Sequence, residues 1–176
     1  FDTSSVIDMD FMFYGASSFN QLLNFNTSSV INMSSVFRDA ISFNQIISFN
    51  TSNVTNMGSM FYGATSFNQP FSFVFNTSSV TNMSLMFQNA VSFNQPLNFN
   101  TGNVTNMEEM FKNAASFDKS LNWDITSVIN INLLGKRIRH SFPWRYWLHT
   151  DNINNIWRFS IYWRRNCCCC KGITNK

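Results

Sequence analysis

The sequence predicts an α/β solenoid of about five 24-residue strand–helix repeats with a parallel sheet. The first observation is a fixed period, because near-copies of one unit begin at Phe1, Phe25, Phe49, Phe75 and Phe99, with spacings of 24, 24, 26 and 24 residues. A period of this size is typical of repeat proteins whose units bury their apolar faces against neighbouring units. The other two observations are a helix-like spacing and a strand-like alternation within each unit.

The helix-like spacing is clearest in the third unit. In VTNMGSMFYGA the apolar residues are Val54, Met57, Met60, Phe61 and Ala64. They fall on one face of a 3.6-residue period. The spacing predicts a short helix over 54–64, and because isolated helices of this length are unstable in water, neighbouring units must hold it.

The strand-like alternation follows the helix-like part. In the fourth unit, Phe93, Gln95, Leu97 and Phe99 alternate with Asn94, Pro96, Asn98 and Asn100. A period of two predicts a strand, and stacked units would place these strands side by side in a parallel sheet.

The third unit is longer than the others by two residues, in FSFVFN. An even insertion leaves later side chains of a strand on their original face. We therefore expect Phe71, Phe73 and Phe75 on one side of the strand, with Ser72 and Val74 on the other.

Recurring Phe and Met residues form the predicted core. Methionine fills gaps between aromatic rings and makes favourable contacts with them. The candidates are Phe13, Phe19, Phe37, Phe43, Phe61, Phe67, Phe87, Phe93, Phe111 and Phe117, with Met33, Met57, Met83 and Met107. Recurring Asn–Gln pairs are expected to form amide ladders along the stack, which end where Asp118–Lys119 replaces the pair.

Composition divides the chain into a repeat region, 1–131, and a tail, 132–176. The repeat region has a formal charge of −5, and the tail, with nine basic residues and one acidic residue, has +8. All four Cys lie in the tail, as Cys167 to Cys170. We interpret the tail as disordered or as an out-of-frame end, and expect neither nucleic-acid binding nor membrane contact from it. The chain starts with Phe inside a repeat, which predicts a fragment, so its lack of a signal peptide says nothing about the intact protein.

No pattern in the chain predicts catalysis, a cofactor or a metal site. There is no P-loop, no GxSxG, no HExxH and no dinucleotide-binding fingerprint. The repeat region contains no His, and the adjacent Glu108 and Glu109 are expected on a solvated helix face. We therefore expect a protein that is not an enzyme.

The units resemble a known family. VTNMGSMFYGATSFNQPF, VTNMSLMFQNAVSFNQPL and VTNMEEMFKNAASFDKSL are similar to the mycoplasma-type repeat of BspA-like leucine-rich-repeat surface proteins, over roughly the first three-quarters of the chain. The resemblance implies a leucine-rich-repeat-like solenoid, a cell-surface or secreted location, and a role in adhesion. It supplies no catalytic residue.

The predicted sheet face carries the candidate binding residues. Rows of short polar side chains flank an apolar row of Leu22, Ile46, Pro70 and Pro96, and such a face could bind a protein or glycan ligand. The polar candidates are Asn20, Asn44, Asn68, Asn94, Asn24, Ser48 and Asn98. A structural spacer or stalk within a larger surface or viral protein is the alternative function. Both solenoid ends lack a polar cap, which predicts self-association through these ends.

Overall fold

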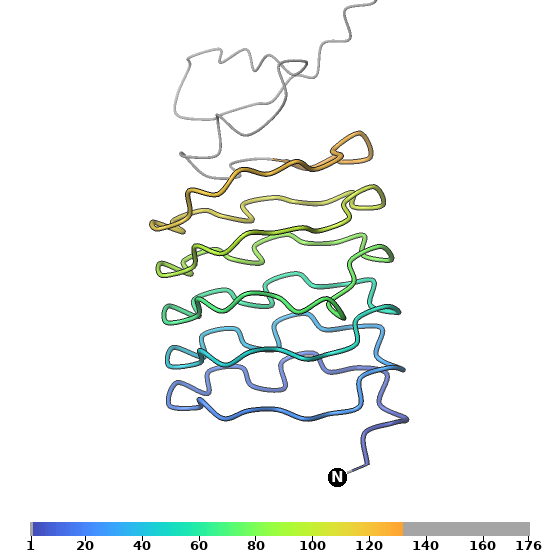
Figure 1. The fold of residues 1–176 in the computed structure, drawn as a ribbon, viewed down its shortest axis with the longest axis vertical. Helices are drawn as coiled ribbons and strands as arrows, with labels where there is room; N and C mark the ends of the chain where they lie inside the picture. The colour runs from blue at the N-terminus through green and yellow to red at the C-terminus, as the bar shows by residue number, and fades with distance from the viewer. Residues whose placement is uncertain (1, 132–176) are drawn as a thin grey trace, which may run out of the picture.

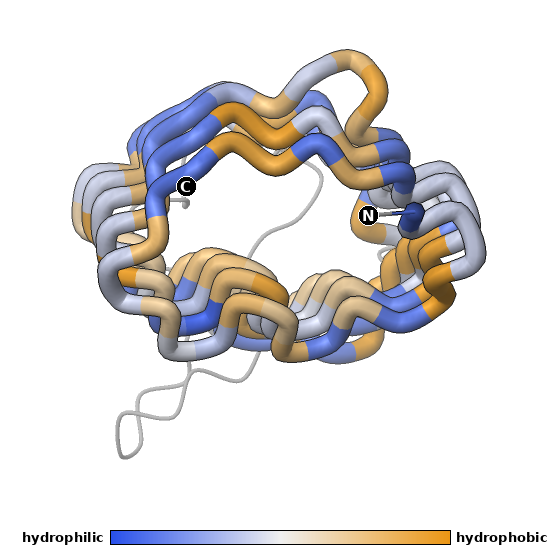
Figure 2. Tube along the Cα trace, turned by 90° about the horizontal axis from the view of Figure 1, so that it is seen from below, coloured by the Kyte–Doolittle hydropathy of each residue, from blue (hydrophilic) through white to orange (hydrophobic). Residues whose placement is uncertain are grey.

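The computed structural model describes residues 2–131, in which the chain winds into a stack of flattened turns (Figure 1). Viewed along the stack, each turn is a ring with two long sides, one undulating and one extended (Figure 2). Successive repeat units lie directly above one another. The predictions made for residues 132–176 lie outside the described range.

The predicted α/β, leucine-rich-repeat-like solenoid with a parallel sheet is wrong. Residues 2–131 contain no α-helix and no β-strand, and their regular pairing is limited to single-residue parallel bridges. These bridges follow one column of the stack: Asp8–Asn32, Asn32–Asn56, Asn56–Asn82, Asn82–Asn106 and Asn106–Asn130.

A series of tight turns replaces the predicted helix. In the third unit, the N–H groups of Met60 and Ala64 donate to the carbonyls three residues earlier, at 3.2 and 3.1 Å. An α-helix would use carbonyls four residues earlier and negative φ throughout. Here Ser59 and Gly63 have φ of 56° and 66°. A positive φ at the third position of a turn is the type II arrangement.

Every second N–H of this segment points along the stack to the next unit. The bonds run from Met57 to the Asn82 carbonyl (2.9 Å), Ser59 to Ser84 (2.8 Å), Phe61 to Met86 (2.9 Å) and Gly63 to Gln88 (2.8 Å). These donors are therefore used between units rather than within a helix. The same pattern recurs in the first, second and fourth units.

The apolar spacing is explained by these turns. Val54, Met57, Met60, Phe61 and Ala64 are all fully buried, so the sequence identified the inward residues correctly. A turn that closes every three or four residues returns the chain to the interior at nearly the helical period. The hydrophobic pattern alone cannot distinguish the two.

The extended side has the predicted alternation but no sheet. Phe93, Leu97 and Phe99 are buried, and Pro96 and Asn98 between them are exposed. Neighbouring extended segments are joined through side-chain amides rather than through a ladder of backbone hydrogen bonds. The proline residues, which have no N–H to donate, are compatible with this arrangement.

The two-residue insertion forms a loop instead of lengthening a strand. A turn closes from the Phe75 N–H to the Ser72 carbonyl at 3.1 Å, and the loop bulges from the extended side (Figure 2). Phe75 is buried and Phe71 is half-buried, but Phe73 is 97% exposed. The expectation that all three share one face is therefore wrong, because the extra residues are taken up within a single turn.

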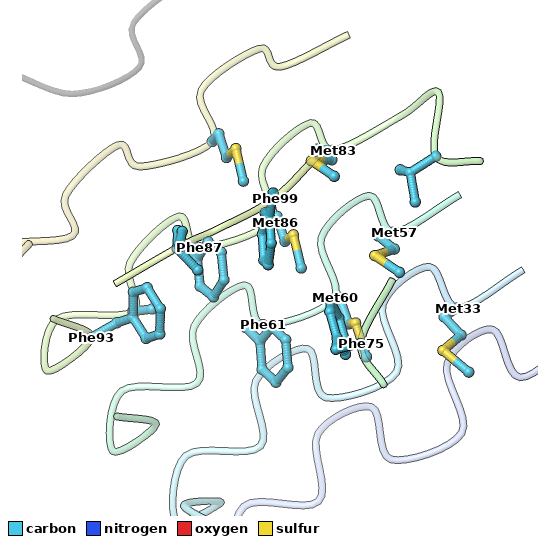
Figure 3. Close-up of a cluster of buried hydrophobic side chains, with 14 of the residues drawn as sticks. Met33, Met57, Met60, Phe61, Phe75, Met83, Met86, Phe87, Phe93 and Phe99 are labelled. Atoms are coloured by element: carbon cyan, nitrogen blue, oxygen red, sulfur yellow. The ribbon is translucent and has the colours of Figure 1, made fainter. Parts of the chain in front are cut away.

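The interior consists of stacked Phe and Met columns. Rings at equivalent positions lie nearly parallel, as in Phe61–Phe87, whose centroids are 5.5 Å apart at 3°. Figure 3 shows Met33, Met57 and Met83 in one such column beside the rings. The predicted core is confirmed, with Phe13 and Phe19 in the first unit only half-buried.

Candidate functional site

The predicted binding residues lie on the extended side of the stack, and they fall into two groups. Asn20, Asn44, Asn68 and Asn94 occupy one column at the start of each extended segment, and all except Asn20 are half-buried. Asn24, Ser48 and Asn98 occupy a second column and are exposed.

The first column forms an amide ladder that holds the stack together. The Oδ1 atoms of Asn20, Asn44 and Asn68 each accept the backbone N–H of the next Asn in the column, at 2.9 Å. Asn94 Oδ1 accepts the N–H of Asp118 at 3.1 Å. Each of these side chains therefore has a structural partner in the next unit.

Glutamine side chains reinforce this ladder. The Nε2 groups of Gln45, Gln69 and Gln95 donate to the Oδ1 atoms of Asn20, Asn44 and Asn68 at 3.0, 3.2 and 3.1 Å. The predicted amide ladder is confirmed, and Asn94 is its last amide, since Asp118 and Lys119 replace the next pair and lie 3.2 Å apart. Burial makes such bonds important, because an unpaired buried amide or N–H is costly. The ladder therefore has a structural role that the sequence prediction did not separate from ligand binding.

The second column remains available to a ligand. The side chains of Asn24, Ser48 and Asn98 make no hydrogen bond within residues 2–131. Beside them Leu22 and Ile46 are 73% and 54% exposed. Short polar and apolar side chains thus alternate across this surface.

Phe73 is the residue that the sequence prediction missed. It stands almost fully in solvent on the insertion loop, in the turn that the Phe75 N–H closes with the Ser72 carbonyl. Large exposed aromatic residues are typical anchors of binding surfaces. The departure from the 24-residue period was the available signal, because extra residues in a repeat commonly form a surface loop.

Other polar columns serve the fold. Buried threonine hydroxyls donate to a carbonyl of the next unit, as Thr51 does to the Asn76 carbonyl at 2.8 Å. The Asn26, Asn50, Asn76 and Asn100 side chains accept the N–H two residues later and so stabilise the turn that follows.

Hydrogen bonds of the same kind lower the pKa of two aspartate side chains, one in the first unit and one in the last described turn. The backbone N–H and hydroxyl of Ser4 lower the pKa of Asp2 below its ordinary value. The hydroxyl and backbone N–H of Thr126 lower the pKa of Asp124 in the same way. Both are exposed and act as turn caps.

Two ion pairs lie on the undulating side, Arg38 with Asp39 and Lys112 with Glu109. The Arg38 guanidinium lies over the rings of Tyr14 and Tyr62, with centroid distances of 5.8 and 4.5 Å, and 3.7 Å from Asp39. Glu109 pairs with Lys112 at 2.9 Å on a turn, not on the predicted helix face. In residues 2–131, no three His, Cys, Asp or Glu side chains are grouped to hold a metal ion.

Comparison with known families identifies the repeat. The model of the family described as "Mycoplasma protein of unknown function, DUF285" matches residues 1–74 and 48–139. The chain belongs to the DUF285 family. The two matches overlap and together cover residues 1–139, which include the whole repeat region, 1–131.

No curated protein and no solved structure matches the chain significantly. The described part of this DUF285 chain also has no helix long and apolar enough to cross a membrane.

Proposed function

We propose that this DUF285 chain is a non-enzymatic interaction module that binds a protein or glycan ligand through its extended side. The observation that carries the proposal is Phe73, which is 97% exposed on a loop that interrupts an otherwise regular stack. A fully exposed Phe offers a large, rigid apolar area to a partner, and aromatic residues of this kind often anchor binding surfaces.

Other residues of the extended side support this role. Leu22 and Ile46 supply exposed apolar area, and the unpaired amides of Asn24 and Asn98 supply hydrogen-bonding groups. Because the other contacts are small and repeated, we expect binding that is weak at each unit and gains from several units acting together.

We further propose that the chain is part of a BspA-like surface protein that acts in adhesion. This proposal is supported by the repeat motif, which resembles that of BspA-like surface proteins. A cell-surface or secreted location follows from that resemblance.

Binding of the full chain to immobilised glycans and extracellular-matrix proteins tests the proposal. The double variant Ile46→Ser, Phe73→Ser should reduce capture at least about tenfold with an unchanged melting temperature, because both side chains are exposed. The control, Ile41→Ser with Val91→Ser, removes two apolar groups that are 50% and 41% exposed on another part of each turn. Equal loss in both variants would contradict a role for the extended side.

A spacer is the second candidate function, favoured by the amide ladder. Asn44 and Asn68 use their side chains to link one unit to the next, as a stiff stalk requires. Force spectroscopy on tandem copies distinguishes the two, because a spacer should resist extension and show no capture of any immobilised ligand.

A further inference from the structure

The extended side of the first four units carries no charged residue. Its segments, 19–26, 43–50, 67–76 and 93–100, contain no Asp, Glu, Lys, Arg or His, although 12% of the chain is charged. The pattern ends in the fifth unit, where Asp118 and Lys119 form an ion pair. Complementary charges guide the binding of proteins to other proteins and to nucleic acids. A surface without charges is therefore suited to an uncharged ligand.

This surface offers free hydrogen-bonding groups of both kinds. The exposed side chains of Ser48 and Asn98 make no hydrogen bond within residues 2–131. The Nε2 groups of Gln45 and Gln95 donate to the amide ladder, but their Oε1 atoms accept no hydrogen bond from these residues. Amides and hydroxyls together supply donors and acceptors, and a sugar hydroxyl is itself both a donor and an acceptor. The free polar groups therefore match those that a sugar presents.

Apolar side chains lie between these polar groups along each segment. Ile46 is 54% exposed, and Pro70 and Pro96 occupy the equivalent exposed position in the next two units. Ligand sites commonly combine apolar side chains with a few polar groups that fix the orientation of the ligand. A sugar ring has the complementary character, because its C–H groups form apolar faces and its hydroxyls lie around the edge.

The insertion loop is joined to this surface at its base. The Ser72 hydroxyl donates to the Ile47 carbonyl at 3.2 Å, which places the start of the loop beside the segment that contains Ile46 and Ser48. Phe73, the next residue, is almost fully exposed. The loop thus adds a large, flat apolar group to a surface whose other side chains are small.

We infer that the extended side binds an uncharged glycan chain, an inference that rests on the binding function proposed above. The polar and apolar positions recur once in each unit, and a glycan chain likewise repeats the same groups along its length. Several units then contact one glycan chain, so that weak contacts add together. The surface of a folded protein has no such repetition and commonly carries charges of both signs, which makes a protein the less suitable ligand.

Capture of the full chain on immobilised polysaccharides tests this inference. Cellulose, chitin and dextran are the neutral probes, and hyaluronan and heparin are the acidic ones. The binding is measured in high salt, which screens the nine basic residues beyond 131. We expect capture on at least one neutral polysaccharide under these conditions. Soluble oligosaccharides of the same polysaccharide should compete more strongly as their length increases.

Two double variants locate the binding surface. Ser48→Ala with Asn98→Ala should lower capture at least about fivefold, because two hydrogen-bonding groups are lost from the extended side. The control, Ser42→Ala with Ser66→Ala, removes two exposed hydroxyls from the turn before each extended segment. None of these four side chains makes a hydrogen bond within residues 2–131, so both variants should keep the melting temperature of the unaltered chain. Equal capture by the two variants would overturn the inference.

The remaining outcomes separate this inference from the proposed function. Capture on immobilised extracellular-matrix proteins, with none on the neutral polysaccharides, would overturn the inference and leave the interaction function standing. Capture on the acidic polysaccharides alone would also overturn it. If the chain is captured on none of these probes, both the inference and the proposed function are contradicted.

Discussion

Asn44 Oδ1 accepts the backbone N–H of Asn68, 24 residues later, at 2.9 Å. A side-chain amide thus occupies the place that a backbone carbonyl would take in a parallel sheet. Because the same bond recurs at Asn20 and Asn68, neighbouring extended segments are joined by side chains. The extended side is therefore regular without being a sheet, and its regularity depends on one residue type at one position.

Replacing Asn68 by Ala should lower the free energy of unfolding by about 1–3 kcal/mol. Asn68 Oδ1 accepts both the Asn94 N–H and the Gln95 amide, and its loss leaves a half-buried backbone donor unpaired. Urea unfolding of the full chain measures the change. Asn98→Ala is the matched control, since the exposed Asn98 side chain makes no hydrogen bond within residues 2–131, and it should change stability by less than about 0.5 kcal/mol. Equal effects would show that the ladder contributes nothing.

Gly63→Ala should destabilise the chain by at least about 1–2 kcal/mol, because L-residues are disfavoured at positive φ. Gly63 has φ of 66°, and an added Cβ would also collide with the Asp39 carboxylate. Thermal unfolding measures the loss. An unchanged melting temperature would mean that the neighbouring turns adjust freely around this position.

Leu85→Asn, in contrast, should stabilise the chain. Leu85 has φ of 60°, a conformation that Asn adopts more readily than Leu. We expect a gain of up to about 1 kcal/mol in the same unfolding experiment. Leu85→Ala is the control, because it removes the same half-buried side chain without the Asn preference for this φ. If the Asn variant is no more stable than the Ala variant, backbone strain at this position is negligible.

Thr51→Val should cost about 1–2 kcal/mol of stability, although the two side chains have nearly the same shape. The buried Thr51 hydroxyl donates to the Asn76 carbonyl at 2.8 Å, and Val leaves that carbonyl without its partner. Thr55→Val is the comparison, since Thr55 is exposed and its hydroxyl lies 3.4 Å from its acceptor. Chemical denaturation should separate the two variants clearly, and similar midpoints would argue against the threonine column.

The sequence predicted what is buried better than how the backbone runs. Val54, Met57 and Met60 were assigned to the interior correctly, because burial depends on the period of apolar residues and successive turns mimic the helical period. Their local structure was missed because it depends on the sign of φ. Gly63 and Asn89 marked the positive-φ position, since Gly and Asn adopt it readily, but at Leu85 no such preference exists.

The candidate site was predicted in part for a related reason. Polar residues on the extended side were identified, but their hydrogen-bond partners lie one unit away, so the sequence could not separate the ladder residue Asn68 from the unpaired Asn98. Phe73 was placed on the same face as Phe71 and Phe75 because an even insertion preserves the faces of a strand. A tight turn obeys no such rule.

Thr126→Val should raise the pKa of Asp124 toward the ordinary value for aspartate. The Thr126 hydroxyl, at 2.7 Å from Asp124 Oδ1, is the main cause of the lowered pKa, and the backbone N–H of the same residue, at 3.0 Å, is the second cause. Because the folded-state pKa lies below the unfolded one, this interaction stabilises the fold above the unfolded pKa, near 3.8, and is lost as the pH falls through the folded value. In the variant, the loss of this stabilisation should therefore begin at a higher pH.

Carboxyl ¹³C chemical shifts followed from pH 7 to pH 2 measure the pKa of Asp124 directly. Ser127→Ala is the control, because the Ser127 hydroxyl donates to the Gly102 carbonyl and not to Asp124. A pKa that is unchanged in Thr126→Val would assign the shift to the backbone N–H alone.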